Sequence, residues 1–554
     1  MMRARVGSRG HVGSSQHGRT LGPRPRHVGV VSAASTGDNH KTGGNGNGGG
    51  GSGNGNGGFP YNSTGNQTGR GGNAMWMHQK KKNSSSVVGS QSTAVKSDIV
   101  PSYEAVERKS FERTPDSRNI SSVDYMNMAT TTRAVVLAGG EQNNPLTKYR
   151  AMPAVPIGCC MLLIDVPINN CLSAGINKVY VMTQFQSHGL HSHIATSYPP
   201  QGFGSRAGGW VDVLTAQQTI KGKEWYKGSA DAIRRNLGEL KDESRGVDPA
   251  TDYVVLSGSA MYNMDISRVV GYHRLKNADI TICSHYVDVD SAINKGVILA
   301  DELGRVTGFF EKPDRAALEF AYGTNSEEVM VNMGVYVFKR DTLIDLLERS
   351  GGEDMDHIGH HVIPAAIAKG LNVFTYEHEG YWRDVSTLKD YYEANIALAS
   401  SEAPIKFFEV DGSVSARGKM LPPARLQGCV QVDESILGDG CTLVDCTISK
   451  SIIGENVLVG SGSLIEESLV LGSPMWTSEA ARDEAKARGD FVFGIGRNTH
   501  LKGCVVDENV YIGDNCVITN EKGVKEADHS PLYMIEDGIV VLLKNAVFPD
   551  GTVI

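Results

Sequence analysis

The stretch LAGGEQNNPLT at residues 137–147 places a glycine turn directly after the apolar run AVVLAGG. A buried strand that ends in glycines is a common phosphate-binding arrangement, because backbone N–H groups at such a turn point at an anion. Gly139 and Gly140 are the candidates for this role. The turn continues Glu141-Gln142-Asn143-Asn144, which supplies a carboxylate and no cation. A working phosphate loop, a degraded one and an ordinary turn therefore all remain open.

A second glycine turn, LSGSAMYNMD at 256–265, also follows an apolar run. From 133 to about 395, short runs rich in Val, Ile and Tyr alternate with helical stretches such as SADAIRRNLGELKDE and RDTLIDLLER. This alternation predicts an α/β domain with a mostly parallel sheet covered on both faces. Ligands bind at the carboxyl ends of the strands in such sheets. We therefore expect the two glycine turns to mark one edge of a site.

After about residue 420 the pattern changes to one aliphatic residue, a glycine and a few polar residues, repeated every five to six positions. CVQVDESILGDGCTLVDCTISKSIIGENVLVGSGSLIEESLVLGS and GIGRNTHLKGCVVDENVYIGDNCVITN both follow it. This hexapeptide repeat predicts a parallel β-helix, in which each short strand forms one side of a triangular coil. Such a solenoid usually supplies subunit contacts and effector sites rather than the main chemistry.

Composition limits the remaining possibilities. A chain of 554 residues predicts two or more domains, and a net charge of −8 gives no general reason to expect nucleic-acid binding. No apolar run approaches 18 residues, so we expect no membrane span. Nine scattered cysteines without a CxxC pair indicate reduced thiols.

The N-terminus has the composition of an organelle transit peptide. Residues 1–37 contain six arginines, several serines and no acidic residue, and they lack the apolar core of a secretory signal. We expect residues 1–40 to be an organelle transit peptide, with a simple basic tail as the alternative. The tract GGNGNGGGGSGNGNGG begins an expected disordered linker over 41–130.

Several motifs in the folded part resemble ADP-glucose pyrophosphorylase, also called glucose-1-phosphate adenylyltransferase. They are RAMPAVPIGCCMLLIDVPINNCLSAG, GSADA, FEKP, NMGVYVFKRD, GIGRNTH and NAVFPDGTVI. INKVYVMTQF and GVYVFKRD are more similar to the large, regulatory subunit of plants and green algae. The resemblance implies a Rossmann-like nucleotidyltransferase domain over 131–398, a linker over 399–420 and a left-handed β-helix over 421–554. It also favours a plastid location, in the chloroplast stroma.

The family's catalytic pattern is only partly present. Catalysis by this family joins ATP and glucose 1-phosphate into ADP-glucose and pyrophosphate, and it depends on cations and Mg²⁺ that neutralise phosphate charge. The loop lacks the family's Gly-Thr-Arg, Met152 replaces a lysine, and Ser259 replaces a metal-holding aspartate. Asp384 remains as a catalytic and weak metal-binding candidate, with Arg383 in place of an acid beside it. Mg²⁺ is thus expected for the assembled enzyme, with binding by this chain in doubt.

Other family positions are kept. By resemblance, Lys312 is a catalytic candidate as well as a sugar-phosphate contact. The candidate substrate-binding residues are Gly139, Gly140, Gln217, Gly228, Ser229, Asp231, Glu311 and Lys312. The candidate residues for the anionic effectors 3-phosphoglycerate and phosphate are Arg150, Arg425, Arg497, Lys502 and Lys544. Each cation alone is a common surface residue, but five kept together while the catalytic cations are lost form a pattern.

These observations predict a regulatory subunit with little or no catalysis of its own. It would assemble with the small subunit, as a heterotetramer, and act in starch synthesis through anion binding, with no nucleic-acid or membrane partner. Two alternatives remain. One is an active adenylyltransferase with a divergent loop, and the other is a non-catalytic binding or scaffold module that keeps only the β-helix interface.

Overall fold

The computed structural model describes residues 128, 130–140, 144–199, 208–216, 225–242, 249–322, 327–349, 354–405, 421–488 and 492–554. All of them belong to one compact unit, Ser102–Ile554. The predicted transit peptide, residues 41–127 of the predicted linker, Glu141 to Asn143, Gln217 and residues 406–420 lie outside the described residues. Met128 is 3% exposed and packs in the hydrophobic core, so the packed chain begins slightly before the expected boundary at residue 131.

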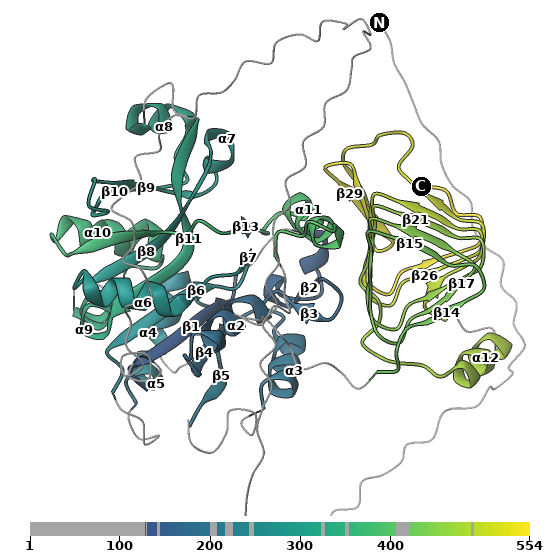
Figure 1. The fold of residues 1–554 in the computed structure, drawn as a ribbon, viewed down its shortest axis with the longest axis horizontal. Helices are drawn as coiled ribbons and strands as arrows, with labels where there is room; N and C mark the ends of the chain where they lie inside the picture. Colours follow the sequence, from purple (N-terminus) through teal and green to yellow (C-terminus); the bar gives the residue numbers. More distant parts are fainter. Residues whose placement is uncertain are drawn as a thin grey trace, which may run out of the picture. The chain divides into compact units, whose positions relative to one another are not determined.

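A nine-stranded sheet forms the first domain (Figure 1). Seven strands follow the order β10-β9-β11-β6-β1-β4-β5, with β8 beside β11 and β12 beside β8. Their bounds are β1 Thr132–Ala138, β4 Lys178–Thr183, β5 Trp210–Thr215, β6 Asp252–Ser257, β8 Ile280–Asp288, β9 Gly296–Ala300, β10 Val306–Glu311, β11 Glu328–Lys339 and β12 Val373–Glu377. The apolar run AVVLAGG contains most of β1, and the apolar run before Gly258 forms β6, because buried strands need side chains that are apolar on both faces.

The sheet is mixed rather than mostly parallel. Strands β6, β1, β4 and β5 run parallel, and so do β8 and β12. Strand β11 is antiparallel to β6, β8 and β9, and β9 is antiparallel to β10. Only residues 301–305 join β9 to β10, and a parallel pair would need a crossover of a dozen or more residues.

Helices cover both faces of this sheet. Successive residues of β1 point to opposite cores, Ala134 and Val136 to one and Val135 to the other. The first core also contains residues of α2 Asp165–Ser173, α3 His188–Ser197, α6 Ile266–Leu275 and α11 Leu388–Ala399, and the second contains residues of α4 Ser229–Arg235, α5 Leu237–Lys241, α9 Arg340–Ile344 and α10 Ile363–Ala368. Further short helices of this domain include α7 Val289–Ala292, α8 Arg315–Tyr322, η5 Asp345–Arg349 and η7 Ile358–Val362.

The helix expected over SADAIRRNLGELKDE is interrupted at Asn236, where α4 ends and α5 begins. The Asn236 side-chain amide donates to the Ala232 carbonyl at 2.8 Å and to the Tyr226 hydroxyl at 2.8 Å. Asparagine commonly makes such side-chain bonds at helix ends, where they replace the next backbone hydrogen bond.

The second domain is a parallel β-helix with three sheets (Figure 1). The first contains β14 Arg425–Gln427, β17 Thr442–Val444, β20 Leu458–Val459, β23 Gly494–Ile495, β26 Tyr511–Ile512 and β31 Val547–Phe548. The second contains β15 Gln431–Asp433, β18 Thr447–Ser449, β21 Leu464–Glu466, β24 His500–Lys502 and β27 Val517–Ile518. The third contains β16 Ile436–Leu437, β19 Ile452–Ile453, β22 Leu469–Val470, β25 Cys504–Val506, β30 Ile539–Leu542, β29 Tyr533–Glu536 and β28 Ala527–His529.

The hexapeptide pattern explains the β-helix interior. Its aliphatic positions, such as Leu443, Ile448 and Ile465, are fully buried in one continuous core. An insertion with helix α12 Glu479–Arg488 separates β22 from β23. The one departure from parallel pairing in these sheets is the antiparallel run β28–β29–β30.

Helix α11 connects the two domains through packing. Its Tyr391, Ala394 and Leu398 belong to the same buried cluster as Ile452 and Leu469 of the β-helix. The domains therefore share one hydrophobic core within the compact unit. All nine cysteines are free thiols, as the sequence predicts. In the described part of the chain, no helix has the length and apolar character needed to cross a membrane.

Candidate nucleotide and sugar-phosphate site

The carboxyl ends of the parallel strands bring the two glycine turns together. The Gly258 N–H donates to the Leu137 carbonyl at 3.0 Å, and β1 pairs with β6 up to Leu137 and Ser257. A Cβ atom on Gly258 would lie 3.0 Å from that carbonyl oxygen. A Cβ atom on Gly139 would lie 3.1 Å from Cβ of Gln184, just beyond β4. The two turns thus lie at one edge of the sheet, as expected, and glycine allows their close approach.

At the described end of the first loop, side chains bond to backbone N–H groups of the same turn. Asn144 precedes the short helical turn η2, Pro145–Thr147, and its side-chain oxygen accepts the Leu146 N–H at 2.9 Å. The Thr147 hydroxyl accepts the Asn144 N–H at 3.3 Å. This is a capping box, in which neighbouring side chains satisfy the N–H groups that would otherwise be open. The Leu146 and Asn144 N–H groups therefore already have acceptors within the turn.

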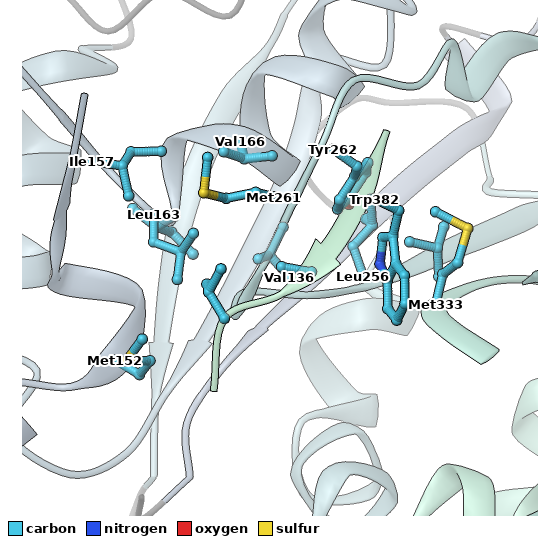
Figure 2. Packing of buried hydrophobic residues seen from close by; sticks show 14 of the residues in the cluster. Val136, Met152, Ile157, Leu163, Val166, Leu256, Met261, Tyr262, Met333 and Trp382 are labelled. Carbon is cyan, nitrogen blue, oxygen red and sulfur yellow. The ribbon is translucent and has the colours of Figure 1, made fainter. Parts of the chain in front are cut away.

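Met152 is a core residue. It begins the short turn η3, Met152–Ala154, and is 1% exposed. Figure 2 shows it with Ile157 and Leu163 among the buried hydrophobic side chains of this domain. A thioether here contributes packing and no charge to the edge where phosphate would lie.

The two expected metal positions are neighbours. Strand β13, Trp382–Asp384, pairs antiparallel with β7, Ala260–Tyr262, so that Asp384 lies opposite Ala260. The Val385 N–H donates to the Ser259 carbonyl at 3.0 Å. The fold therefore brings Ser259 and Asp384 together, although 125 residues separate them in the sequence (384 − 259).

The groups around these positions do not fit a Mg²⁺ ion. The Ser259 and Ser257 hydroxyls lie 3.0 Å apart, and the Asp384 carboxylate accepts hydrogen bonds from the Ser386 N–H and hydroxyl. Burial raises the pKa of Asp384, and the Ser386 hydroxyl and the Lys295 ammonium only partly offset this. One carboxylate with serine hydroxyls is a weak donor set, since Mg²⁺ binds mainly through carboxylates and phosphates.

Arg383, which replaces a family acid, turns toward helix α11. Its guanidinium lies 3.0 Å from the Asp390 carboxylate and 2.6 Å from that of Glu393. These two carboxylates raise the pKa of Arg383 against the opposing effect of burial. Arg383 thus holds β13 against α11.

The Glu311–Lys312 pair lies at the end of β10. Glu311 is opposite Gly296 of β9, and the Lys312 N–H donates to the Lys295 carbonyl at 3.0 Å. A Cβ atom on Gly359 would lie 2.5 Å from the Glu311 carboxylate, so a side chain there would displace the carboxylate from this position. Lys312 has a φ of 48°, a conformation uncommon for a residue with a side chain.

The GSADA turn is held against residues 356–358. A Cβ atom on Gly228 would lie 2.4 Å from the Asp356 carbonyl, so only glycine fits. The Ser229 hydroxyl accepts the Ile358 N–H at 2.9 Å, and the Ala230 N–H donates to the Asp356 carbonyl at 2.8 Å. These partners could not be identified from the sequence, because more than 120 residues separate them from the turn.

Asp231 is buried and organises the same turn. Its carboxylate accepts the Lys227 N–H at 2.9 Å and pairs with Arg234 at 2.5 Å and Arg235 at 2.9 Å. Burial alone raises the pKa of Asp231, but the Lys227 N–H and the two guanidinium groups outweigh it and lower the pKa. The shape of the turn is therefore preserved by fully formed internal bonds.

Comparison with known families agrees with this architecture. Residues 133–401 match the family model described as nucleotidyl transferase. Residues 419–553 match the model described as the GLGC left-handed parallel beta-helix domain. The two domains together indicate an ADP-glucose pyrophosphorylase-like chain. The predicted fold class, a nucleotidyltransferase domain followed by a left-handed β-helix, is confirmed.

Two of the expected effector cations meet between the nucleotidyl transferase domain and the GLGC-type β-helix. Arg150, 6% exposed, lies 2.6 Å from Asp507 and 3.2 Å from Glu508. Lys544 reaches the same Glu508 carboxylate at 2.7 Å. In the described part of the chain, the buried Nη1 of Arg150 has no hydrogen-bond partner. Asp507 and Glu508 were missed from the sequence, where DEN reads as an ordinary turn between repeats.

The other three cations lie elsewhere on the β-helix. Arg425 belongs to β14 of the first sheet, Arg497 lies two residues after β23 of the same sheet, and Lys502 belongs to β24 of the second sheet. The Arg497 side chain is 70% exposed, 3.8 Å from the Asp514 carboxylate. The five cations therefore do not form a single cluster. Arg150 and Lys544 share Glu508 as a partner.

Proposed function

We propose that this chain is a regulatory subunit of an ADP-glucose pyrophosphorylase, with little or no catalysis of its own. In the proposal it assembles with a catalytic small subunit as a heterotetramer in the plastid stroma. The assembled enzyme makes ADP-glucose and pyrophosphate from ATP and glucose 1-phosphate for starch synthesis, and the small subunit supplies the Mg²⁺ site. This chain adjusts its partner through 3-phosphoglycerate and phosphate.

One contrast carries the proposal. The sugar-phosphate end keeps its shape, with the Gly228 turn fixed by Asp356 and with Glu311 and Lys312 at the end of β10. The nucleotide and metal end has lost its charges, with Met152 in the core and Ser259 beside a lone Asp384. Nucleotidyl transfer depends on charge neutralisation, and removing one preorganised donor commonly costs about 100- to 1000-fold in rate. Such a site can bind a ligand but lacks the charges that nucleotidyl transfer needs.

A regulatory role predicts two results when the chain is purified with a small subunit. The two chains should co-purify as a complex whose activation by 3-phosphoglycerate differs from that of the small subunit alone. Arg497→Met in this chain should raise the half-activating concentration of 3-phosphoglycerate several-fold. The Arg497 guanidinium is exposed and its contact with Asp514 is long, at 3.8 Å. It can therefore form a shorter and stronger charge-assisted contact with an anion. Activity assays across effector concentrations measure both.

Lys450→Met is the matched control. Lys450 lies on another turn of the β-helix and has no expected effector role, so its loss should leave the half-activating concentration unchanged. Failure to co-purify, or a complex with the effector response of the small subunit alone, would contradict the regulatory proposal. A complex that assembles normally but responds to effectors like the small subunit alone would favour the scaffold alternative.

A further inference from the structure

A lysine that the catalytic pattern does not include lies over Trp382, two residues before Asp384 of the degraded metal position. The Lys295 ammonium is 5.9 Å from the centre of the Trp382 ring. Trp382 begins β13 and Asp384 ends it. Residues i and i+2 of a strand point to the same side. The Lys295 cation is therefore on the side of β13 from which the Asp384 carboxylate projects.

Lys295 is placed on that side of β13 by its contact with the Trp382 ring. Arg383, the nearest cation along the chain, is instead engaged by Asp390 and Glu393. Trp382 itself is 8% exposed and packs beside Tyr262 and Met333 (Figure 2), so the surface beneath the ammonium is firmly packed.

The backbone also ties Lys295 to the sugar-phosphate end. Its carbonyl accepts the Lys312 N–H at 3.0 Å, and the next residue, Gly296, pairs with Glu311. Adjacent strand ends therefore carry Lys295 and Lys312 side by side along the backbone. An anion held by Lys312 would meet a second fixed cation where a sugar nucleotidyltransferase would place a metal ion.

We propose that the Lys295 ammonium replaces the divalent metal beside Asp384, so that the site binds a sugar phosphate monoester without Mg²⁺. The proposal rests on the proposed function in one respect, that the sugar-phosphate end still holds its ligand. An ammonium balances one carboxylate and donates hydrogen bonds to a phosphate. A divalent metal ion carries two charges and bridges several phosphate oxygens, whereas an ammonium does not. This difference accounts for ligand binding without reaction.

Metal binding by the chain alone tests the replacement without any sugar ligand. Mn²⁺ serves as the divalent ion, and electron paramagnetic resonance measures its free concentration during titration. We expect negligible binding by the wild type at about 1 mM Mn²⁺. Ser259→Asp with Lys295→Met should bind at least about tenfold more tightly, because it has a second carboxylate and no competing cation.

The matched control combines Ser259→Asp with Lys276→Met. The Lys276 ammonium lies 5.8 Å from the ring centres of Tyr272 and Phe374, in a comparable cation–π contact away from Asp384. This control should bind Mn²⁺ no better than Ser259→Asp alone. Equal Mn²⁺ affinity in the wild type and in the Ser259→Asp, Lys295→Met variant would overturn the proposal.

Calorimetry with glucose 1-phosphate tests ligand binding. The wild type should have the same Kd, within about twofold, in EDTA and in excess Mg²⁺. Lys295→Met should weaken binding at least about tenfold, the worth of one charge-assisted contact, whereas Lys276→Met should not. A wild type that needs Mg²⁺, or that binds nothing in either buffer, would overturn the proposal. Both tests use the chain alone, so they are independent of assembly and effector response, on which the proposed regulatory function depends.

Discussion

Restoring the missing charges should give the chain ADP-glucose synthesis of its own. The combined change is Ser259→Asp, Lys295→Met and replacement of residues 141–144 by a loop with the family's Gly-Thr-Arg. We expect Mg²⁺-dependent synthesis to rise at least about 100-fold over the wild type, since each preorganised charge is worth about 100- to 1000-fold. Ser259→Asp alone should give no gain, because Lys295 and the altered loop remain. Pyrophosphate release coupled to a colour reaction measures the rate.

The control keeps the size of the new side chain and removes its charge. Ser259→Asn in the same combination should show no gain, because an amide cannot supply the second carboxylate that the metal needs. Equal rates for the Asp and Asn combinations would contradict the account. So would no gain in the Asp combination when the protein is folded.

The family pattern also contains a lysine at the position of Met152, and the structure alters what its restoration should do. Met152 is 1% exposed among core side chains. A lysine there must carry its ammonium out to the sheet edge or remain buried, and an unpaired buried charge is costly. Met152→Lys should therefore be added to the triple change only in a second step. The thermal stability and the activity of that variant should both be measured.

Arg150→Met should strongly destabilise the contact between the two domains. Arg150 and Asp507 form a buried ion pair at 2.6 Å, with side chains 7% and 2% exposed. Removal of one partner leaves the other charge buried and uncompensated, which typically costs about 3–5 kcal/mol. The change should lower the temperature of the first unfolding transition by roughly 5–10 °C, as expected for a domain of this size. Differential scanning calorimetry measures it.

Two further variants identify the cause. Arg268→Met removes an exposed partner of Asp265, 3.3 Å away, and should cost no more than about 1 kcal/mol. Arg150→Met with Asp507→Asn removes the stranded charge as well and should recover most of the loss. An unfolding temperature for Arg150→Met equal to that of Arg268→Met would show that the pair does not hold the domains together.

The sequence contains enough information for the architecture. RAVVLAGG predicts β1 and the glycine turn after it, because a continuous apolar run bounded by glycine has few other structures available. The five- to six-residue period predicts the β-helix for the same reason, as each repeat must stack on the next to bury its aliphatic side chain. The mixed direction of the sheet was not predicted, because strand direction depends on connections rather than on strand composition.

The site was less predictable, because its partners are distant in sequence. Gly139, Gly228 and Glu311 were found through resemblance, and close contacts in the structure explain the two glycines, whereas the pairing of β10 with β9 places Glu311. Lys295 was missed because only the pairing of β9 with β10 and the packing of Trp382 bring it near Asp384. Arg150 was expected to meet effectors, but its carboxylate partner Asp507, 357 residues away, could not be inferred from spacing.

The most direct test of the central claim is synthesis of ADP-glucose by the purified chain alone, with ATP, glucose 1-phosphate and Mg²⁺. The account predicts a rate below about 1% of that of its complex with a small subunit, because the loop, Met152 and Ser259 supply none of the charges that the reaction needs. A rate for the lone chain comparable to that of the complex would contradict it.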